Sequence, residues 1–209
     1  MSVSTNIWVW NKLYAKDANR QMFGDDTTAK IAAKWFAGLT TIEDWGCGHG
    51  GFKLYLPPST QYIGIDGSNS RHADIISDLE YFHSSNPDGI LLRHVLEHNR
   101  NWELILKNAL KSFEKKLCII LFTPFTNNET KVIAEYKNFF DGGMDIYDIA
   151  FKKLDILYPI SAVPSSIFHV IPNIKTNTQY GEETMILVER LTEPERAEIQ
   201  KWADERGIR

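Results

Sequence analysis

Three residues with acid–base or metal-binding side chains lie close together in the segment 93–99 (RHVLEHN). If this segment turns helically, the spacing i, i+3 and i+4 places His94, Glu97 and His98 on one face. Two imidazoles and a carboxylate on one face can hold a divalent metal and leave positions open for a substrate. Without a metal, either histidine can serve as a general base, because the imidazole pKa lies near neutral pH. The candidate catalytic residues are therefore His94 and His98.

A second candidate feature is the glycine-rich segment 43–52 (EDWGCGHGGF). Its backbone must turn tightly and approach a ligand closely. Lys53 does not stand where a phosphate-binding P-loop needs its lysine, which excludes that loop. Gly46, Gly48 and Gly51 fit the Gly-x-Gly-x-x-Gly spacing of dinucleotide folds, so the glycines alone do not exclude that class.

Two aspartates that end consecutive predicted strands narrow the choice of ligand. Asp44 stands two residues before the first glycine, where a carboxylate would repel a pyrophosphate but could bind the ammonium of an amino-acid group. Asp66 follows about 20 residues later, where the ribose hydroxyls of an adenosine group are usually held. The sequence therefore predicts a nucleotide-like ligand with an amino-acid end.

The pattern DxGxGxG at 44–50, followed by Asp66 and Asp78, resembles the class I S-adenosylmethionine-dependent methyltransferases. The resemblance covers about residues 40–125. It implies that Gly46–Gly50 pass the methionine part, that Asp66 binds the ribose diol and that Asp78 and Leu79 lie beside the adenine. The alternative is an ordinary glycine turn with surface aspartates. The cofactor-binding residues implied are Asp44, Trp45, Gly46, Cys47, Gly48, Gly50, Asp66, Gly67, Ser68, Asp78, Leu79 and Arg93.

The segment 93–99 is also similar to the Glu-x-x-Glu-His segment of small-RNA 3′-terminal ribose methyltransferases and ubiquinone-pathway methyltransferases. In those families it binds a metal that holds adjacent hydroxyls of the acceptor. Glu97 and His98 match, but His94 replaces the first glutamate, which favours manganese, iron or zinc over magnesium. The resemblance implies a divalent metal, manganese or magnesium, with a further ligand from Asp148 or His169. In many other methyltransferases, the equivalent glutamate and histidine are hydrogen-bonded supports without a metal.

Strands and helices that could position these residues alternate along the chain. Strands are predicted at 41–45, 61–65, 75–76, 89–92 and 117–122. Helices are predicted after a cap at Thr27 or Thr28, after the glycine turn and from Asn101. The alternation predicts an α/β, Rossmann-like methyltransferase fold, with a mostly parallel sheet, an antiparallel closing strand and helices on both faces. Ligands of such sheets bind beyond the carboxyl ends of the strands.

A length of 209 residues suits a single methyltransferase domain, 1–209. Its expected parts are an N-terminal cap and first helix (1–40), a cofactor-binding core (41–123), an acceptor-side insertion (124–165), and closing strands with a C-terminal helix (166–209). The aromatic residues Trp8 and Trp10 of the cap could stack on a sugar. Later elements are predicted as a helix at 127–140, a turn at 141–143, an amphipathic piece at 150–157, an antiparallel pair at 167–171 and 184–189, and a charged helix at 194–206.

Composition limits the classes of partner. The net charge is −4, the pI is about 5.9, and the basic residues do not form one block, which argues against a nucleic-acid surface. The N-terminus lacks a signal-like pattern and no run approaches the length of a membrane span, so a soluble, cytoplasmic protein is expected, in the host cytoplasm if it is viral. Cys47 and Cys118 give neither a disulfide framework nor zinc spacing.

These features predict an S-adenosylmethionine-dependent O-methyltransferase for one hydroxyl of a vicinal diol, in a sugar of a glycan. The whole chain resembles bacterial and large-virus methyltransferases linked to glycan decoration, including chlorovirus-type rhamnose O-methyltransferases. Other hypotheses are a small-molecule methyltransferase of the catechol or quinone type, an RNA ribose methyltransferase, and a non-catalytic cofactor-binding protein. The acceptor is expected to be a small molecule or glycan, and the sequence does not predict the oligomeric state.

Overall fold

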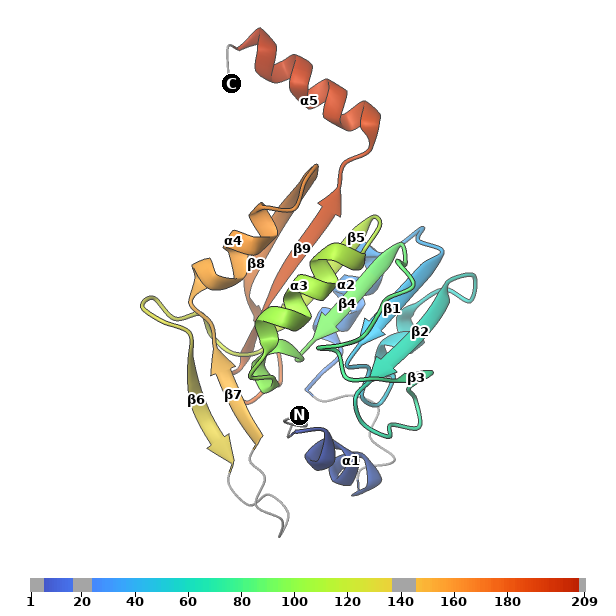
Figure 1. Cartoon of the computed structure of the whole chain (residues 1–209), viewed down its shortest axis with the longest axis vertical. Helices are drawn as coiled ribbons and strands as arrows, with labels where there is room; N and C mark the ends of the chain where they lie inside the picture. The colour runs from blue at the N-terminus through green and yellow to red at the C-terminus, as the bar shows by residue number, and fades with distance from the viewer. Residues whose placement is uncertain (1–5, 17–23, 137–145, 207–209) are drawn as a thin grey trace.

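A twisted central sheet organises the computed structural model, which describes residues 6–16, 24–136 and 146–206. Within these residues the sheet has seven strands in the order β3-β2-β1-β4-β5-β9-β8 (Figure 1). Strands β1 to β5 run parallel, while β9 is antiparallel to β5 and β8 is antiparallel to β9. The fold is therefore the predicted mostly parallel α/β sheet with antiparallel closing strands. The strands are β1 Thr41–Trp45, β2 Gln61–Asp66, β3 Ile75–Ile76, β4 Gly89–Arg93, β5 Lys116–Leu121, β8 Ser166–Lys175 and β9 Glu182–Arg190.

Helices cover both faces of this sheet and divide the core into two layers. Helix α2 (Thr27–Trp35) and the 3-10 helix η1 (Gly51–Tyr55) pack on one face, and α3 (Trp102–Ser112) and α4 (Lys153–Ser161) pack on the other. Neighbouring residues of β5 enter different layers: Ile119 faces α3 and Ile120 faces α2. Because both faces are buried, such a strand is a continuous apolar run rather than an alternating one.

Helix α2 begins where the sequence predicts, but without the predicted cap. Asp26 occupies the N-cap position and makes no side-chain capping hydrogen bond. Thr27 and Thr28 already belong to the first turn of the helix. Thr28 is fully buried, and its hydroxyl donates to the carboxylate of Glu183 on β9. This threonine therefore joins the helix to the closing strand.

The predicted helix at 127–140 is wrong. Residues Lys131–Tyr136 form strand β6, which pairs antiparallel with β7 (Ile146–Ala150) in a separate two-stranded sheet. The segment is rich in β-branched and aromatic residues, and its paired residues lie ten to nineteen positions further along the chain. Pairing with β7 therefore overrides the local helical pattern. Strand β7 and helix α4 also divide the predicted amphipathic piece at 150–157. The predicted turn at 141–143 lies outside the described residues.

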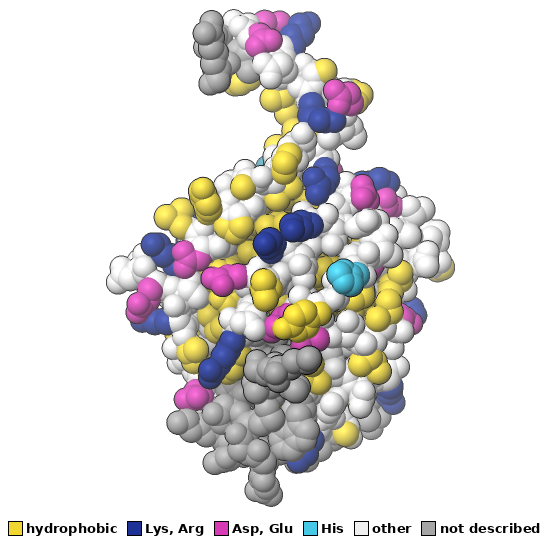
Figure 2. Space-filling view, in the orientation of Figure 1, with side chains coloured by type: hydrophobic (Ala, Val, Ile, Leu, Met, Phe, Trp, Pro, Cys, Tyr) yellow, Lys and Arg dark blue, Asp and Glu magenta, His cyan; other side chains and the backbone are white. Residues whose placement is uncertain are grey.

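Two further helices lie at opposite ends of the molecule. Helix α1 (Ile7–Lys16) lies at the carboxyl ends of the parallel strands, whereas α5 (Glu193–Glu205) projects away from the other end (Figure 1). On the face shown in Figure 2, lysines and arginines are scattered among acidic side chains rather than gathered into one patch. In the described part of the chain, no helix has both the length and the apolar character needed to cross a membrane.

Candidate functional site

A cavity of about 440 Å³ lies at the carboxyl ends of the parallel strands, beside α1. Its walls come from the glycine turn after β1, the ends of β2 and β4, Phe122 after β5, the β6–β7 pair and the turn between β8 and β9. Cofactor and substrate cavities of proteins usually measure about 300–1,000 Å³. The position is the one where open parallel sheets bind ligands. Both candidate clusters of the sequence reach this cavity.

The glycine turn depends on left-handed backbone and on close packing. Gly46, Gly48 and Gly50 all have positive φ, between 53° and 74°. A Cβ added at Gly46 would lie 2.5 Å from the Cγ2 of Val95, and one at Gly48 would lie 3.0 Å from the hydroxyl oxygen of Tyr14. The absence of side chains here lets the backbone form the cavity wall directly.

Replacing Gly46 with Ala is expected to destabilise the protein more than replacing Gly181 with Ala. Both glycines have nearly the same φ, +74° and +73°, but a Cβ at Gly181 would meet nothing within 4 Å. The left-handed backbone should cost about 1–2 kcal/mol in both variants, and the contact with Val95 should cost Gly46→Ala about 1–3 kcal/mol more. Chemical denaturation measures the two free energies of unfolding. Equal losses would show that Val95 moves aside without cost.

Asp66 links the end of β2 to the glycine turn. Its Oδ2 accepts a hydrogen bond from the Gly48 amide (2.9 Å), and its Oδ1 accepts from the amide and the hydroxyl of Ser68 (2.8 and 2.5 Å). Burial raises the pKa of Asp66, while these hydrogen bonds favour its charged form. A carboxylate oriented from both sides in this way is suited to bind the hydroxyls of a ligand.

Asp44 lies deeper in the same wall. It is 4% exposed, and its Oδ2 accepts a hydrogen bond from the Tyr62 hydroxyl (2.8 Å). Burial raises the pKa of Asp44 to about 7. A cationic group bound beside it would therefore favour the ionised carboxylate.

Most of the predicted cofactor-binding residues line the cavity, but two do not. Trp45 is buried on the α3 face, and its Nε1 donates to Glu43 (2.8 Å), because successive side chains of β1 point to opposite faces of the sheet. Gly50 lies behind the turn, where a Cβ would contact His72. The ten that line it are Asp44, Gly46, Cys47, Gly48, Asp66, Gly67, Ser68, Asp78, Leu79 and Arg93.

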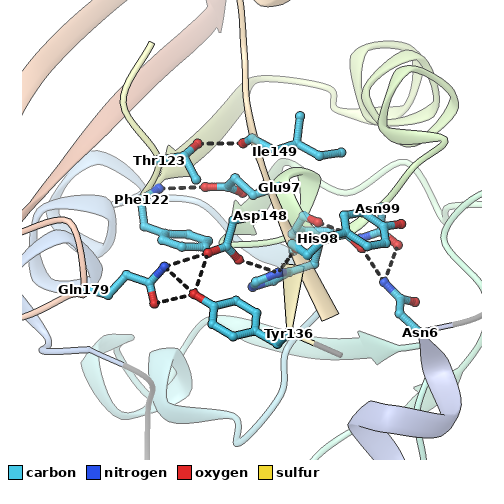
Figure 3. A network of polar contacts seen from close by, with 12 residues as sticks. Asn6, Glu97, His98, Asn99, Phe122, Thr123, Tyr136, Asp148, Ile149 and Gln179 are labelled. Atoms are coloured by element: carbon cyan, nitrogen blue, oxygen red, sulfur yellow. Dashed lines mark hydrogen bonds and ion pairs between the residues drawn. The ribbon is translucent and has the colours of Figure 1, made fainter. Parts of the chain in front are cut away.

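His98 lines another wall of the cavity, at the end of the 3-10 helix η2 (Leu96–His98), and its side chain is 14% exposed. Its Nδ1 lies 3.0 Å from the Tyr147 carbonyl oxygen and 3.4 Å from Oδ1 of Asp148. Figure 3 shows His98 and Asp148 facing each other. Because a carbonyl only accepts, Nδ1 carries the proton and Nε2 keeps a lone pair in the neutral ring. Burial lowers the pKa of His98, and the Tyr147 carbonyl and Asp148 oppose this shift.

Asp148 connects His98 to two other parts of the chain. Its Oδ2 accepts hydrogen bonds from Nε2 of Gln179 (2.6 Å), from the hydroxyl of Tyr180 (3.0 Å) and from the hydroxyl of Tyr136 (3.2 Å). Figure 3 shows Asp148 between His98 on one side and Tyr136 and Gln179 on the other. The carboxylate is buried and well supplied with donors, so it can orient the imidazole and stabilise its charged form.

His94 forms a second acid–histidine pair. Its Nε2 lies 2.9 Å from Oε1 of Glu183. The same oxygen lies 3.3 Å from the guanidinium nitrogen Nη2 of Arg93. Burial, with the charge of Arg93, lowers the pKa of His94 to about 4. Although burial opposes it, the hydrogen bond from His94 and the charge of Arg93 lower the pKa of Glu183. His94 also has φ +58°, a backbone conformation that is uncommon outside glycine and frequent at functional sites.

The predicted metal ligands do not converge. The left-handed residue His94 precedes η2, so His94 and Glu97 do not share one helical face. Glu97 is fully buried, its Oε1 accepts from the Phe122 amide (2.6 Å), and burial raises its pKa to about 8. His169 is exposed on β8, away from the cavity. Across residues 6–16, 24–136 and 146–206, no group of three or more His, Cys, Asp or Glu side chains could hold a metal ion.

Several residues of the site were not predicted from the sequence. Glu183 lies at the start of β9, whereas Asp44 lies near the end of a strand, directly before the glycine turn, so the signal that identified Asp44 does not mark Glu183. Tyr136 was hidden in the wrongly predicted helix, and Gln179 lies in a polar turn with no local signal. Among the cap aromatics, Trp10 lines the cavity, with its ring centroid 5.1 Å from that of His98. The side chain of Trp8 is outside the described part.

No protein-family model and no curated protein matches this sequence. The fold is nevertheless similar to solved methyltransferase structures. Magnesium protoporphyrin IX methyltransferase (ChlM) from Synechocystis PCC 6803, with bound S-adenosylhomocysteine (SAH), has a TM-score of 0.62 and 14% identity over 89% of this chain and 100% of that one. The DhpI–SAM–HEP complex has a TM-score of 0.61 and 12% identity, covering 90% and 99%.

A third similar structure is the N-terminal domain of EvdMO1, solved in the presence of SAH and D-fucose. Its TM-score is 0.58 and its identity 16%, over 79% of this chain and 82% of that chain. At such low identities the comparisons show the fold alone. The chain therefore has the Rossmann-like fold of class I methyltransferases.

Proposed function

We propose that this chain is an S-adenosylmethionine-dependent O-methyltransferase that acts on a sugar hydroxyl. The observation that carries the proposal is the pairing, in one cavity, of the Asp44–Gly48 turn and Asp66 on one wall with the acid-backed His98 on the other. The first wall suits an adenosyl amino acid, and the second suits removal of a proton from an acceptor.

Each part of the cofactor would be held by a different residue of the cavity wall. Asp66 would hold the ribose hydroxyls, Asp44 the ammonium, and Asp78 with Leu79 the adenine. The buried Asp44 carboxyl gains its charge most readily beside a cation, which fits an ammonium partner. When bound, the cofactor supplies an electrophilic methyl group on a sulfonium, and this group needs alignment with the acceptor oxygen rather than further activation.

His98 would act as the general base. The Nδ1 proton is fixed toward the Tyr147 carbonyl and Asp148, so Nε2 is the nitrogen that accepts the hydroxyl proton. As the oxygen forms its bond to the methyl carbon, the carbon–sulfur bond breaks and its electron pair returns to sulfur. The products are a methyl ether, the neutral thioether and an imidazolium whose charge Asp148 stabilises.

A sugar acceptor is supported by the composition of the second wall and by one structural neighbour. Trp10 and Phe122 give apolar rings beside His98, while Thr178 and Gln179 give polar groups. Such a mixture suits a sugar, which has apolar faces and a rim of hydroxyls. The EvdMO1 domain was solved in the presence of the deoxyhexose D-fucose. Rhamnose, also a deoxyhexose, is therefore our first candidate acceptor.

Chelation is expected to leave methyl transfer unchanged. The predicted metal ligands are engaged elsewhere: His94 by Glu183, Glu97 by the Phe122 amide and Asp148 by three donors. The measurement is SAH formation with a panel of methyl glycosides, rhamnosides foremost, before and after treatment with a chelator and with manganese or magnesium restored. Activity that falls after chelation and returns with manganese would contradict the metal-free mechanism. If no glycoside accepts a methyl group, the sugar assignment is wrong.

A further inference from the structure

Two acid–histidine pairs from different parts of the chain face the same aromatic ring. The ring centroids of His94 and His98 lie 5.0 and 5.2 Å from that of Phe122, and all three residues line the cavity. His94 is backed by Glu183 from β9, and His98 is backed by Asp148 from β7. The proposed O-methyltransferase reaction needs one base, so the second pair calls for a role of its own.

The backing groups place the protons of the two rings on different nitrogens. The Glu183 carboxylate, ionised and held by Arg93, accepts from Nε2 of His94, which leaves the lone pair of that ring on Nδ1. The Tyr147 carbonyl accepts from Nδ1 of His98, which leaves the lone pair on Nε2. The neutral histidines are therefore in opposite tautomers, and each has one nitrogen able to accept a hydrogen bond.

We propose that His94 and His98 form a metal-free clamp for a vicinal diol, in which His98 receives the proton of the reacting hydroxyl and His94 accepts a hydrogen bond from its neighbour. The clamp deepens the proposed function and rests on it. It names the substrate class, an acceptor with two adjacent hydroxyls, and makes His94 a positioning and specificity residue.

The charged groups around His94 and His98 suit the two histidines to different roles. Arg93 shares Oε1 of Glu183 with His94, so an imidazolium at His94 would face a guanidinium across one oxygen. In the described part of the chain, the partners of Asp148 other than His98 are the hydroxyls of Tyr136 and Tyr180 and the amide of Gln179, none of which carries a positive charge. His98 is therefore the better proton acceptor, and His94 is suited to hold a neutral hydroxyl.

A first experiment needs no acceptor. Long-range ¹H–¹⁵N spectra of the full chain at neutral pH report the protonated nitrogen of each imidazole, and His94→Asn and His98→Gln variants assign the signals. The expected result is an Nε2-H ring for His94 and an Nδ1-H ring for His98. Identical tautomers, or a charged ring at either position, would overturn the clamp.

A second experiment compares methyl α-L-rhamnoside with its monodeoxy analogues as acceptors. His94→Asn is the chosen variant because asparagine tolerates the left-handed backbone at this position. We expect the variant to lower kcat/KM about tenfold for the diol but to leave unchanged the value for the analogue that lacks the neighbouring hydroxyl. An equal loss with both acceptors would overturn the clamp and leave the proposed function intact. Absence of transfer by the unmodified protein to every glycoside would overturn the proposed function and the clamp with it.

Discussion

His98→Ala is expected to lower the turnover number about 100- to 10,000-fold, the usual contribution of a positioned general base. The same change should alter the affinity for S-adenosylmethionine by less than about threefold, because the His98 imidazole makes its hydrogen bonds with β7 and takes no part in those of Asp66 with Gly48 and Ser68. The reason lies in the geometry of the ring: Nδ1 is committed to the Tyr147 carbonyl and Asp148, and Nε2 is the atom available to the acceptor. Turnover is measured as SAH release, and affinity is measured by calorimetry.

His169→Ala is the matched control for this variant. His169 is an exposed histidine on β8, outside the residues that line the cavity, so its removal should change neither quantity. Full turnover in His98→Ala would show that the segment 93–99 is structural and that the base lies elsewhere. A loss of cofactor affinity equal to the loss of turnover would place His98 in the cofactor site instead.

Asp66→Ala is expected to weaken the binding of S-adenosylmethionine about 100-fold or more, since charge-assisted hydrogen bonds to two ribose hydroxyls would be lost. The carboxylate also orders the Gly48 amide and Ser68, so the alanine variant removes part of the support of the turn as well. Asp66→Asn fills the same space without the charge, and its single amide oxygen keeps the hydrogen bonds from either Gly48 or Ser68, so it removes less of this support than alanine does. Calorimetric titration with the cofactor should show weakened binding for both variants.

Asp74→Ala provides the control for the aspartate itself. Asp74 also accepts a hydrogen bond from a backbone amide of β2, that of Gly64 (2.8 Å), but it does not line the cavity. Its removal should leave cofactor affinity within about threefold of the unmodified value. Unchanged affinity in Asp66→Asn would remove the ribose assignment, and equal losses in Asp66→Asn and Asp74→Ala would point to general damage of β2.

The sheet could be predicted because its signals are local. Residues 117–121 are apolar without interruption since helices cover both faces of β5, and the glycines after β1 mark a turn that other residues cannot form. The same local reasoning failed at 131–136. There β-branched and aromatic residues compete with a helical pattern, and pairing with β7 decides the conformation.

The candidate site was predictable on one wall and hidden on the other. Asp44 and Asp66 stand at fixed offsets from the glycines, so spacing alone identifies them. The partners of the histidines come from distant segments: Glu183 meets His94, and Asp148 meets His98. The metal hypothesis assumed helical backbone at His94, and the observed φ of +58° turns that residue away from Glu97 toward β9.

The division of the core into two layers bears on how the molecule unfolds. Ile119 and Ile120 are neighbours on β5, yet they belong to opposite layers, so β5 cannot leave one layer while the other stays closed. On β4, which ends at Arg93, the neighbours Ile90 and Leu91 are divided between the two layers in the same way. Loss of either layer therefore dismantles both walls of the cavity together, and binding competence and the folded core should disappear in a single cooperative transition.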